Sequence, residues 1–418
     1  MTEKSKVIFG NKISDKDYKS AIKAKKGYIK KYGDDSSTDY KIRVTDNKVI
    51  GSLLGVKNVE VTAKIQSSEG TMDTEKGIIV GNIRMGFGHY RISMAMASCA
   101  KSMGYKPYWM DLNSYPETTC TKVIGAQNDL YSLGSRLSQK FWLFNKLVWE
   151  PMNYEGFRKL SYNASDQKNA ELMAPVFRNI PKDIPVIGTH VWPAQAAIHA
   201  GMEYVVNAIP DNWPMALHLA EGAVHTVQTP GAYLGYRVLR GMDRKRVLKP
   251  MPEESIVQTG HYIDHELAAN IKKDCELRMK RANSGGARRY LLTIGGAGAQ
   301  KEIYSSIIRL LLPCVKKGKA VLLINVGDHK NVWEELKKDL PNINATEHFN
   351  DFAETRAFAQ NALEGEIHGV HVFCSDDIFA AVYSTNLLMR VCDILVTKPG
   401  ELSFYPVPKL MIKRVGGH

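Results

Sequence analysis

The sequence has no long apolar segment, no paired cysteine motif and no secretory signal. No apolar stretch reaches the roughly 18–20 residues that a membrane-spanning helix needs. Residues 1–6 are polar and are followed by no apolar core, so we expect no signal peptide. The 6 cysteines include no CxxC pair and mostly stand among apolar residues. This pattern predicts buried, reduced thiols and a cytoplasmic protein.

Several signatures of catalysis and binding are also missing. The chain contains no GxSxG motif and no Walker A motif. Its 12 histidines lack ligand spacing such as HxxxH on a shared helix face, so no metal site is predicted. No nucleic-acid module and no interleaving of aromatic with basic residues is visible, so we expect no nucleic-acid partner.

The composition is that of a globular protein with a basic excess. A length of 418 residues, with 44% hydrophobic and 24% charged residues, suits two domains and an appendage. The net charge of +13 comes from basic residues spread through 19–31, 237–249 and 272–289. An anionic substrate or an anionic membrane surface would account for this excess, and solvated helix faces are the alternative.

Two regions of alternating strands and helices follow a lysine-rich N-terminal extension over residues 1–75. We expect one Rossmann-like lobe over residues 76–260 and a second over residues 261–418, facing each other across a cleft. The predicted fold class is therefore α/β. The expected helices cover residues 15–31 (capped by Asp15), 90–103, 129–157, 165–177, 300–316, 332–340 and 377–392. The expected strands cover residues 41–44, 59–62, 77–80, 106–112, 185–188, 204–209, 223–227, 256–260, 290–294, 320–326, 369–373, 394–397 and 409–412.

A loop of small residues follows the strand at residues 290–294. Its members are Gly295, Gly296, Ala297, Gly298 and Ala299, and a helix is expected to begin at the next residue. A strand that breaks into such a loop and resumes as a helix presents free backbone N–H groups to a phosphate or a sugar. A tight turn that serves packing alone is the alternative.

A second turn follows the strand at residues 394–397. It contains Lys398, Pro399, Gly400 and Glu401. The Lys398 cation could neutralise a pyrophosphate, and the Glu401 carboxylate could bind a pair of ribose hydroxyls. A capped strand end is the alternative.

A third loop, Gly81 to His89, joins a strand to a helix in the first lobe. Gly86 and Gly88 permit close backbone approach, although the spacing does not match GxGxxG. His89 lies at the start of the helix, where the positive helix end favours neutral imidazole. A neutral imidazole can act as a general base on an acceptor hydroxyl. A histidine that only caps or packs is the alternative.

Other polar residues follow predicted strands, where open sheets place ligands. His190 and Asp211 could orient an acceptor or assist the base, and a hydrogen-bonded structural pair is the alternative. Ser375, followed by Asp376 and Asp377, could contact a nucleobase. One of the two aspartates is expected to cap the next helix.

Together these motifs resemble the GT-B glycosyltransferases. The resemblance is to the branch that holds the peptidoglycan lipid-intermediate N-acetylglucosaminyltransferase and the monogalactosyldiacylglycerol synthases. It covers residues 77–418 in order and spacing. It rests on four short segments: Gly86-Phe-Gly88-His89-Tyr-Arg91, Pro210-Asp211, the loop Gly295 to Ala299, and Cys392 to Gly400.

The resemblance implies a role for each lobe. In the first, acceptor-side lobe it implies catalytic roles for His89 and Asp211 and acceptor contacts from Gly86, Gly88 and Arg91, to which the strand-end position adds His190. In the second, donor-side lobe it implies donor contacts from Gly295, Gly296, Ala297, Gly298, Ala299, Lys398 and Gly400. Ser375, by its strand-end position, and Glu401, in the turn after Gly400, complete the predicted donor site. The implied donor is a nucleotide sugar, UDP-linked as in this branch, and no cofactor or metal is implied.

Two departures from this family concern the donor site. The family has a longer helix after the turn, with a glutamate that holds the donor ribose. Here Pro406 stands near that position and the distance from Gly400 to Pro408 is too short, so Glu401 is the proposed substitute. The family also continues beyond Gly417. We therefore expect either a fragment or an incomplete donor site.

The leading hypothesis is an inverting, nucleotide-sugar-dependent glycosyltransferase that acts on an acceptor hydroxyl. The apolar residues 141–144 and the basic excess would suit a lipid acceptor and a peripheral position on the inner face of the membrane, although this segment could equally be core. A nucleotide-sugar epimerase is the second hypothesis. A binding protein for a nucleotide sugar or a lipid headgroup, without turnover, is the third.

Overall fold

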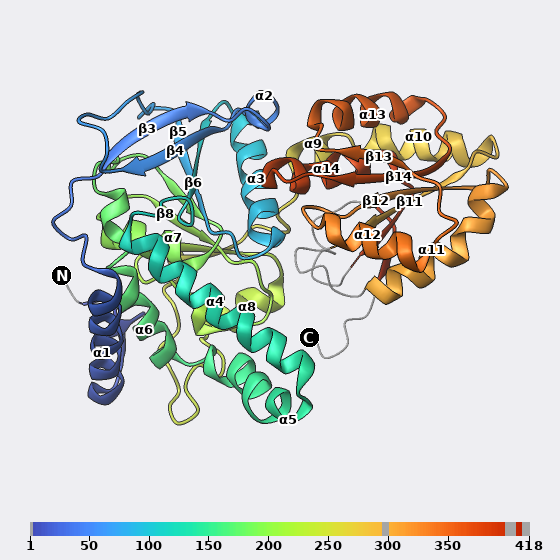
Figure 1. The fold of residues 1–418 in the computed structure, drawn as a ribbon. Coiled ribbons are helices and arrows are strands. Elements are labelled where there is room, and N and C mark those ends of the chain that lie inside the picture. The colour runs from blue at the N-terminus through green and yellow to red at the C-terminus, as the bar shows by residue number, and fades with distance from the viewer. Residues whose placement is uncertain (1–2, 295–300, 398–406, 412–418) are drawn as a thin grey trace. The chain divides into compact units, whose positions relative to one another are not determined.

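The computed structural model describes residues 3–294, 301–397 and 407–411, and the chain divides into two compact units (Figure 1). Unit 1 consists of residues 1–47, 55–85 and 100–261, and unit 2 of residues 48–54, 86–99 and 262–418. The chain therefore passes between the units several times. Each unit is described separately.

Unit 1 is built on an eight-stranded sheet. In spatial order its strands are β10 (Ile256–Gln258), β9 (Val224–Val227), β8 (Val205–Ala208), β7 (Val186–Gly188), β5 (Gly77–Asn82), β6 (Lys106–Asp111), β4 (Lys57–Thr62) and β3 (Lys41–Asp46). Every neighbouring pair is parallel except β3 with β4. From β5 the chain builds the sheet first toward β6 and then toward β7. The strand order therefore reverses between β5 and β7, as in a doubly wound fold.

The segment predicted as an N-terminal extension contributes directly to this sheet. Strands β3 and β4 continue it beyond β6. Before them lie a short hairpin of β1 (Val7–Ile8) and β2 (Asn11–Lys12) and helix α1 (Asp15–Tyr32). The cap of α1 is Ser14 and not Asp15, because Ser14 has extended backbone angles and its side chain accepts a hydrogen bond from Asp17 N at 3.1 Å.

Unit 1 also contains helices and helical turns. They are α4 (Thr119–Lys140), α5 (Trp142–Phe144), the π-helical turns η1 (Asn145–Trp149) and η2 (Met152–Gly156), α6 (Leu160–Ala170), the 3₁₀ turn η3 (Ala174–Phe177), α7 (Val191–His199), the 3₁₀ turn η4 (Ala216–His218), α8 (Pro230–Arg237) and the 3₁₀ turn η5 (Glu253–Ser255). The helix expected over residues 129–157 is interrupted, because Phe141 takes extended backbone angles.

Unit 2 is a smaller sheet of the same kind. Its strand order is β13 (Thr346–Phe349), β14 (Gly369–Cys374), β12 (Ala320–Asn325), β11 (Arg288–Thr293), β15 (Ile394–Thr397) and β16 (Lys409–Met411). All neighbouring pairs are parallel. The prediction of two Rossmann-like parallel sheets in an α/β chain is therefore confirmed.

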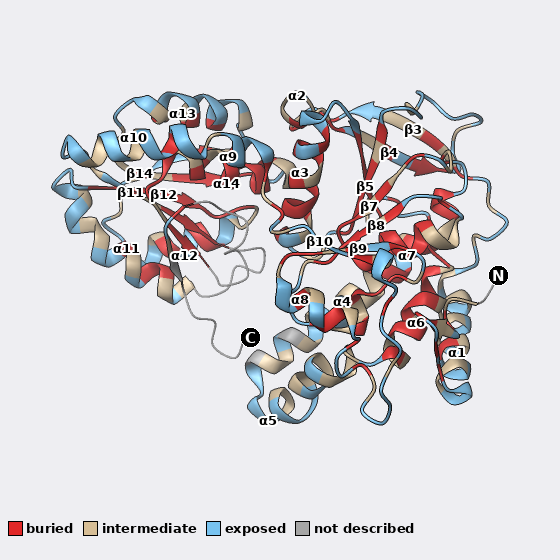
Figure 2. Cartoon of the chain, turned by 180° about the vertical axis from the view of Figure 1, so that it is seen from behind, coloured by how far each residue is buried: buried red, intermediate tan, exposed pale blue. Residues whose placement is uncertain are grey.

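The helices of unit 2 are buried to different extents (Figure 2). They are α2 (Gly51–Leu54), α3 (Phe87–Ser102, which belongs to unit 2 up to Cys99), α9 (His265–Ala269), α10 (Ile271–Asn283), α11 (Lys301–Lys316), α12 (Lys330–Asp339), α13 (Phe352–Glu364) and α14 (Ile378–Val391). Strand β12 is buried along its whole length, as expected for a central strand that is apolar up to its last residue, Asn325.

The cysteines are only partly as predicted. Three are buried: Cys120, Cys374 and Cys392. The other three, Cys99, Cys275 and Cys314, are exposed because they lie on the outer faces of helices. All six are free. Among the described residues, no helix is both long and apolar enough to cross a bilayer.

Helix α6 turns several polar side chains into the interior of unit 1. Asn163 donates hydrogen bonds to the carbonyl oxygens of Ala216 and Leu219 at 2.8 and 2.7 Å. Asp166 is less well satisfied, because its buried Oδ2 has no hydrogen-bond partner within the described part of the chain. Burial raises the pKa of Asp166 to about 8, against the opposing effect of a hydrogen bond with Trp192. The folded protein therefore favours the protonated carboxyl at neutral pH.

This buried acid should make stability depend on pH. Between about pH 4 and pH 8 the unfolded chain has released the Asp166 proton while the folded chain retains it, so the free energy of unfolding should fall as the pH rises. The variant Asp166→Asn should lack this component. We expect its stability relative to the wild type to increase from pH 5 to pH 8 in urea titrations.

Tryptophan fluorescence is a suitable signal for these titrations, because Trp333 alone of the 6 tryptophans lies in unit 2. The comparison with the wild type cancels the contribution of other titrating groups, including His199 and His225, whose pKa values are lowered to about 4 by desolvation. A stability difference that stays constant over this pH range would contradict the assignment.

Candidate functional site

The strand order of unit 2 reverses between β11 and β15, which are neighbours in the sheet. The last residues of these strands meet there, since the hydroxyl of Thr293 donates a hydrogen bond to that of Thr397 at 2.9 Å. In open α/β sheets, ligands bind outside the carboxyl ends of the strands at such a switch point. Both loops predicted to bind the donor begin at this place.

Most of the predicted donor residues lie outside the described residues. These are Gly295, Gly296, Ala297, Gly298, Ala299, Lys398, Gly400 and Glu401. The structure does describe β11 and β15, the two strands that lead into these loops.

Ser375 is the one predicted donor residue that the structure describes. It lies just beyond β14 and lines a narrow hollow with Asn325, Asp351, Phe352 and Cys374. The Ser375 hydroxyl accepts a hydrogen bond from Asp377 N at 3.3 Å, and Asp377 caps α14 by accepting from Ala380 N at 3.0 Å. The predicted capping role is therefore confirmed for Asp377.

The first turn of α3 packs against the same edge of the unit 2 sheet. The ring of Phe87 lies 6.2 Å from that of His329, which follows β12, and Tyr90 lies 5.8 Å from Phe379 at the start of α14. Gly327 is needed for this approach, because a Cβ there would lie 2.6 Å from the Phe87 ring. His89 is in this turn and is partly exposed. The predicted base is thus carried to the loops that follow β12 and β14.

Arg91, predicted to contact the acceptor, is buried beside α14. Its Nη2 donates to the Thr385 hydroxyl at 3.3 Å, and that hydroxyl also accepts from Asn325 Nδ2 at 2.8 Å. Asn325 lines the hollow beside Ser375. Asn325 was not predicted as a site residue, although a polar residue at the end of an apolar strand could have indicated one.

The two glycines before His89 differ in their structural need. Gly86 has a φ of +78°, which side chains rarely adopt, so the turn itself requires glycine. Gly88 lies within α3 at an ordinary φ, and a Cβ there would meet nothing within 4 Å. The space beside Gly88 is therefore open. A ligand would need such a space to approach the start of the helix closely.

Unit 1 has its own switch point, between β5 and β7. Thr189, just after β7, donates its backbone N–H to Gly81 O of β5 at 2.9 Å. His190 caps α7, where its Nδ1 accepts from Trp192 N at 3.2 Å. Asn82 ends β5 with both side-chain polar atoms buried and without a hydrogen-bond partner among the described residues. This unsatisfied amide was not recognised in the sequence, because burial cannot be read there.

Asp211 follows β8 in unit 1 and is largely exposed. Its Oδ2 lies 3.2 Å from Nε2 of His218, a buried residue that sequence reasoning did not link to it. Within the described ranges, no group of three or more histidine, cysteine or acidic side chains could hold a metal ion.

Asp264 connects three segments of unit 2 just after the chain enters it. Its carboxylate accepts from the Ser98 hydroxyl of α3 at 2.8 Å and from Asn386 Nδ2 of α14 at 3.0 Å. It also caps α9 by accepting from Glu266 N at 2.8 Å. Burial raises the pKa of Asp264, and these three hydrogen bonds oppose that rise.

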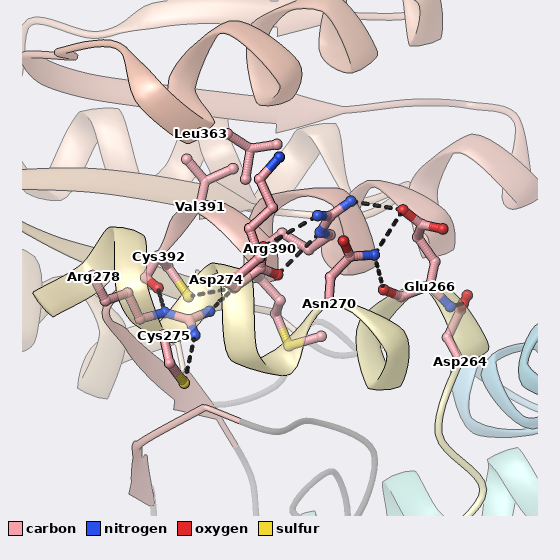
Figure 3. Close-up of polar contacts among 12 residues, drawn as sticks. Asp264, Glu266, Asn270, Asp274, Cys275, Arg278, Leu363, Arg390, Val391 and Cys392 are labelled. Carbon is pink, nitrogen blue, oxygen red and sulfur yellow. Dashed lines mark hydrogen bonds and ion pairs between the residues drawn. The ribbon is translucent and has the colours of Figure 1, made fainter. Parts of the chain in front are cut away.

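An arginine network continues this connection along α9, α10 and α14 (Figure 3). Arg390 of α14 makes a bidentate pair with Asp274 of α10 at 3.0 and 3.1 Å, and a further pair with Glu266 at 2.7 Å. Arg278 donates to the carbonyl oxygens of Cys392 and Met389 at the carboxyl end of α14. These contacts fix α14, the helix that packs beside α3, to α9 and α10.

Replacing Arg390 should therefore loosen α14. Asp274 has only 4% of its side chain exposed, so Arg390→Gln would leave a buried carboxylate without its cation. We expect a loss of about 3 kcal/mol in the stability of unit 2, seen as reduced hydrogen-exchange protection of α10 and α14. The double variant with Asp274→Asn should recover part of this loss. Unchanged protection in the single variant would show that the pair is dispensable.

The comparisons with known proteins concern the family of the chain. No curated protein matches the chain. A matching solved structure is the crystal structure of UDP-GlcNAc 2-epimerase from Neisseria meningitidis bound to UDP-GlcNAc, with 12% identity and a TM-score of 0.40, covering 81% of this chain and 83% of that chain. Residues 251–418 match a family model described as domain of unknown function (DUF6938). Residues 7–238 match the model described as domain of unknown function (DUF6937), and the chain belongs to that family.

Proposed function

We propose that the protein is a nucleotide-sugar-dependent glycosyltransferase that acts by a single inverting displacement. The observation that carries the proposal is the contact between Thr293 and Thr397. It makes the strands before the two predicted donor loops neighbours at the switch point of a doubly wound sheet. Two loops that start side by side at such a point can bind one pyrophosphate together.

The residue types of these loops suit a nucleotide diphosphate. The small residues Gly295 to Ala299 would offer backbone N–H groups, and Lys398 a positive charge, to the departing pyrophosphate. Ser375 lies beyond β14 in the same sheet, and its hydroxyl would contact the nucleobase of the donor. A uridine diphosphate sugar is the first donor to test.

His89 is the proposed general base. The first turn of α3, which carries His89, packs against the segments after β12 and β14 through the rings of Phe87 and Tyr90. His89 therefore belongs to the unit that would hold the donor. The imidazole would take the proton of an acceptor hydroxyl while the hydroxyl oxygen bonds to the anomeric carbon. The bond from that carbon to the diphosphate oxygen would break, and the electron pair would leave with the nucleotide diphosphate.

Unit 1 is the proposed acceptor side. Asp211 and His190 both follow strands of its sheet, and the largely exposed carboxylate of Asp211 lies within ion-pair distance of His218, which would orient it. An oriented carboxylate can accept a hydrogen bond from an acceptor hydroxyl. We propose this role for Asp211, with His190 as a positioning residue at the start of α7.

The variant His89→Ala tests the proposed base. Loss of a general base should lower kcat by about 10²- to 10⁴-fold, while the thermal shift caused by a bound nucleotide should remain. The measurement is transfer from a labelled UDP-sugar to a lipid extract. His368→Ala, at an exposed histidine elsewhere in unit 2, is the matched control. Wild-type turnover in His89→Ala would remove this residue from the mechanism.

The same labelled donor separates the proposed function from its alternatives. A transferase should give a glycosylated acceptor and free nucleotide diphosphate only when acceptor is present. Conversion of the labelled donor to an epimer without acceptor would indicate an epimerase instead. A thermal shift with UDP-sugars but no product under either condition would indicate a binding protein. No shift with any nucleotide sugar would contradict the whole proposal.

The variant Gly88→Ala tests for a ligand beside α3. A methyl group there meets no protein atom within 4 Å, and alanine favours a helix by roughly 0.5–1 kcal/mol over glycine, so stability should be unchanged or higher. If substrate approaches this turn, KM for the acceptor should rise several-fold. Gly231→Ala, also open to solvent near the start of a helix, is the control. Unaltered kinetics would place the acceptor elsewhere.

A further inference from the structure

One edge of unit 1 combines exposed apolar side chains with unneutralised positive charge. Helix α1, the loop of residues 243–249 and the segment from the end of α4 to η1 lie along the same lower edge of this unit in both overall views (Figures 1 and 2). Two polar contacts connect them. Arg244 pairs with Glu155 of η2 at 2.6 Å, and Arg246 donates to Lys12 O, just before α1, at 3.2 Å.

The apolar part of this edge is a helical segment without a core of its own. No residue of α5, η1 or η2 is buried. Trp142 is 69% exposed, and the segment exposes further large apolar side chains: Phe141, Leu143, Leu147 and Val148. Monomeric proteins rarely expose so many contiguous apolar side chains unless they contact a partner or a membrane.

Positive charge flanks these apolar side chains closely. The ammonium groups of Lys140 and Lys146 lie over the rings of Phe141 and Trp142 at 5.6 and 5.1 Å. In the loop of residues 243–249, Lys245 is exposed and Val247 is fully exposed. Aromatic and aliphatic side chains with lysines beside them match the boundary between lipid headgroups and acyl chains.

Helix α1 adds a regular stripe of lysines. Lys16, Lys19, Lys23, Lys26 and Lys30 recur every three or four residues and are all exposed, while Ala21 on the other side is buried. The stripe is about 21 Å long at 1.5 Å per residue. Within the described part of the chain, none of these five lysines has an ion-pair partner. Lys25, on the inner side, pairs with Glu171.

We propose that this edge, the basic–apolar edge of unit 1, docks on an anionic lipid surface. Phosphate headgroups would neutralise the α1 stripe and Lys245, and the side chains around Trp142 and Val247 would enter the interface. A second copy of the chain fits less well, because a two-fold contact would bring one lysine stripe against the other. The inference goes beyond the proposed function and stands without it, since docking requires no reaction.

Vesicle sedimentation tests the proposal. The full chain should bind vesicles of phosphatidylcholine mixed with phosphatidylglycerol, and should bind phosphatidylcholine alone much more weakly. Raising the salt concentration should weaken binding, because it screens the lysines. Equal binding to both kinds of vesicle, or binding to neither, would overturn the proposal.

Two pairs of substitutions locate the surface. Trp142→Ser with Leu143→Ser should weaken binding to the anionic vesicles more than tenfold. Lys19→Gln with Lys23→Gln should weaken it by roughly fivefold for each lysine. The matched controls are in unit 2: Leu310→Ser, at a leucine that is 77% exposed, and Lys316→Gln with Lys317→Gln. Both controls should bind like the wild type.

All substituted positions are exposed, so each variant should keep the thermal midpoint of the wild type, which is the check on folding. Unchanged vesicle binding in both edge variants would overturn the proposal. So would a dimer, detected by light scattering, that the same substitutions dissociate, because the edge would then be an interface between copies. Binding of an oligonucleotide in place of vesicles, lost in the lysine variant, would identify a polyanion site instead and would equally overturn it.

Discussion

The buried carboxylate of Asp264 is the interaction on which the arrangement of unit 2 depends. It lies two residues beyond the start of the last segment of this unit and binds α3, α14 and the first turn of α9 at once. A buried carboxylate is costly unless its oxygens are satisfied, and here three donors converge on it from separate segments. Arg390 and Asp274 extend the same connection to α10. Because α3 carries His89, this network also decides where the proposed base lies.

Parallel pairing is the second constraint, because it brings all carboxyl ends of a sheet to one edge. In unit 2 this edge gathers Thr293, Thr397, Asn325 and Ser375, which are widely separated in the sequence. Helix α3 follows β5 of unit 1 along the chain, yet residues 86–99 pack with unit 2. The proposed catalytic turn and the proposed donor loops therefore belong to one compact unit, although the chain between them forms most of the other.

Much of the fold could be predicted because its central strands are strongly apolar and end in small or polar residues. Strands β11, β12 and β15 were predicted to within about two residues for this reason. The edge strand β13, with the sequence Thr-Glu-His-Phe, was missed, because an exposed edge strand carries no continuous apolar signal. The break at Phe141 was also missed, since the residues on both sides favour a helix. Asn82, Asn325 and His218 were missed because burial and pairing depend on distant segments.

The sequence by itself determined the α/β class, the positions of most strands and the residue types of the three loops. These are local properties, since apolar periodicity and small residues act within a few positions of the chain. Only the tertiary structure decided that the strands leading into the Gly295 and Lys398 loops are neighbours, that α3 packs with unit 2, and that α1 and the Trp142 segment share one edge of unit 1. Strand order and helix packing arise from contacts between residues far apart in the chain, and a local pattern carries no record of them.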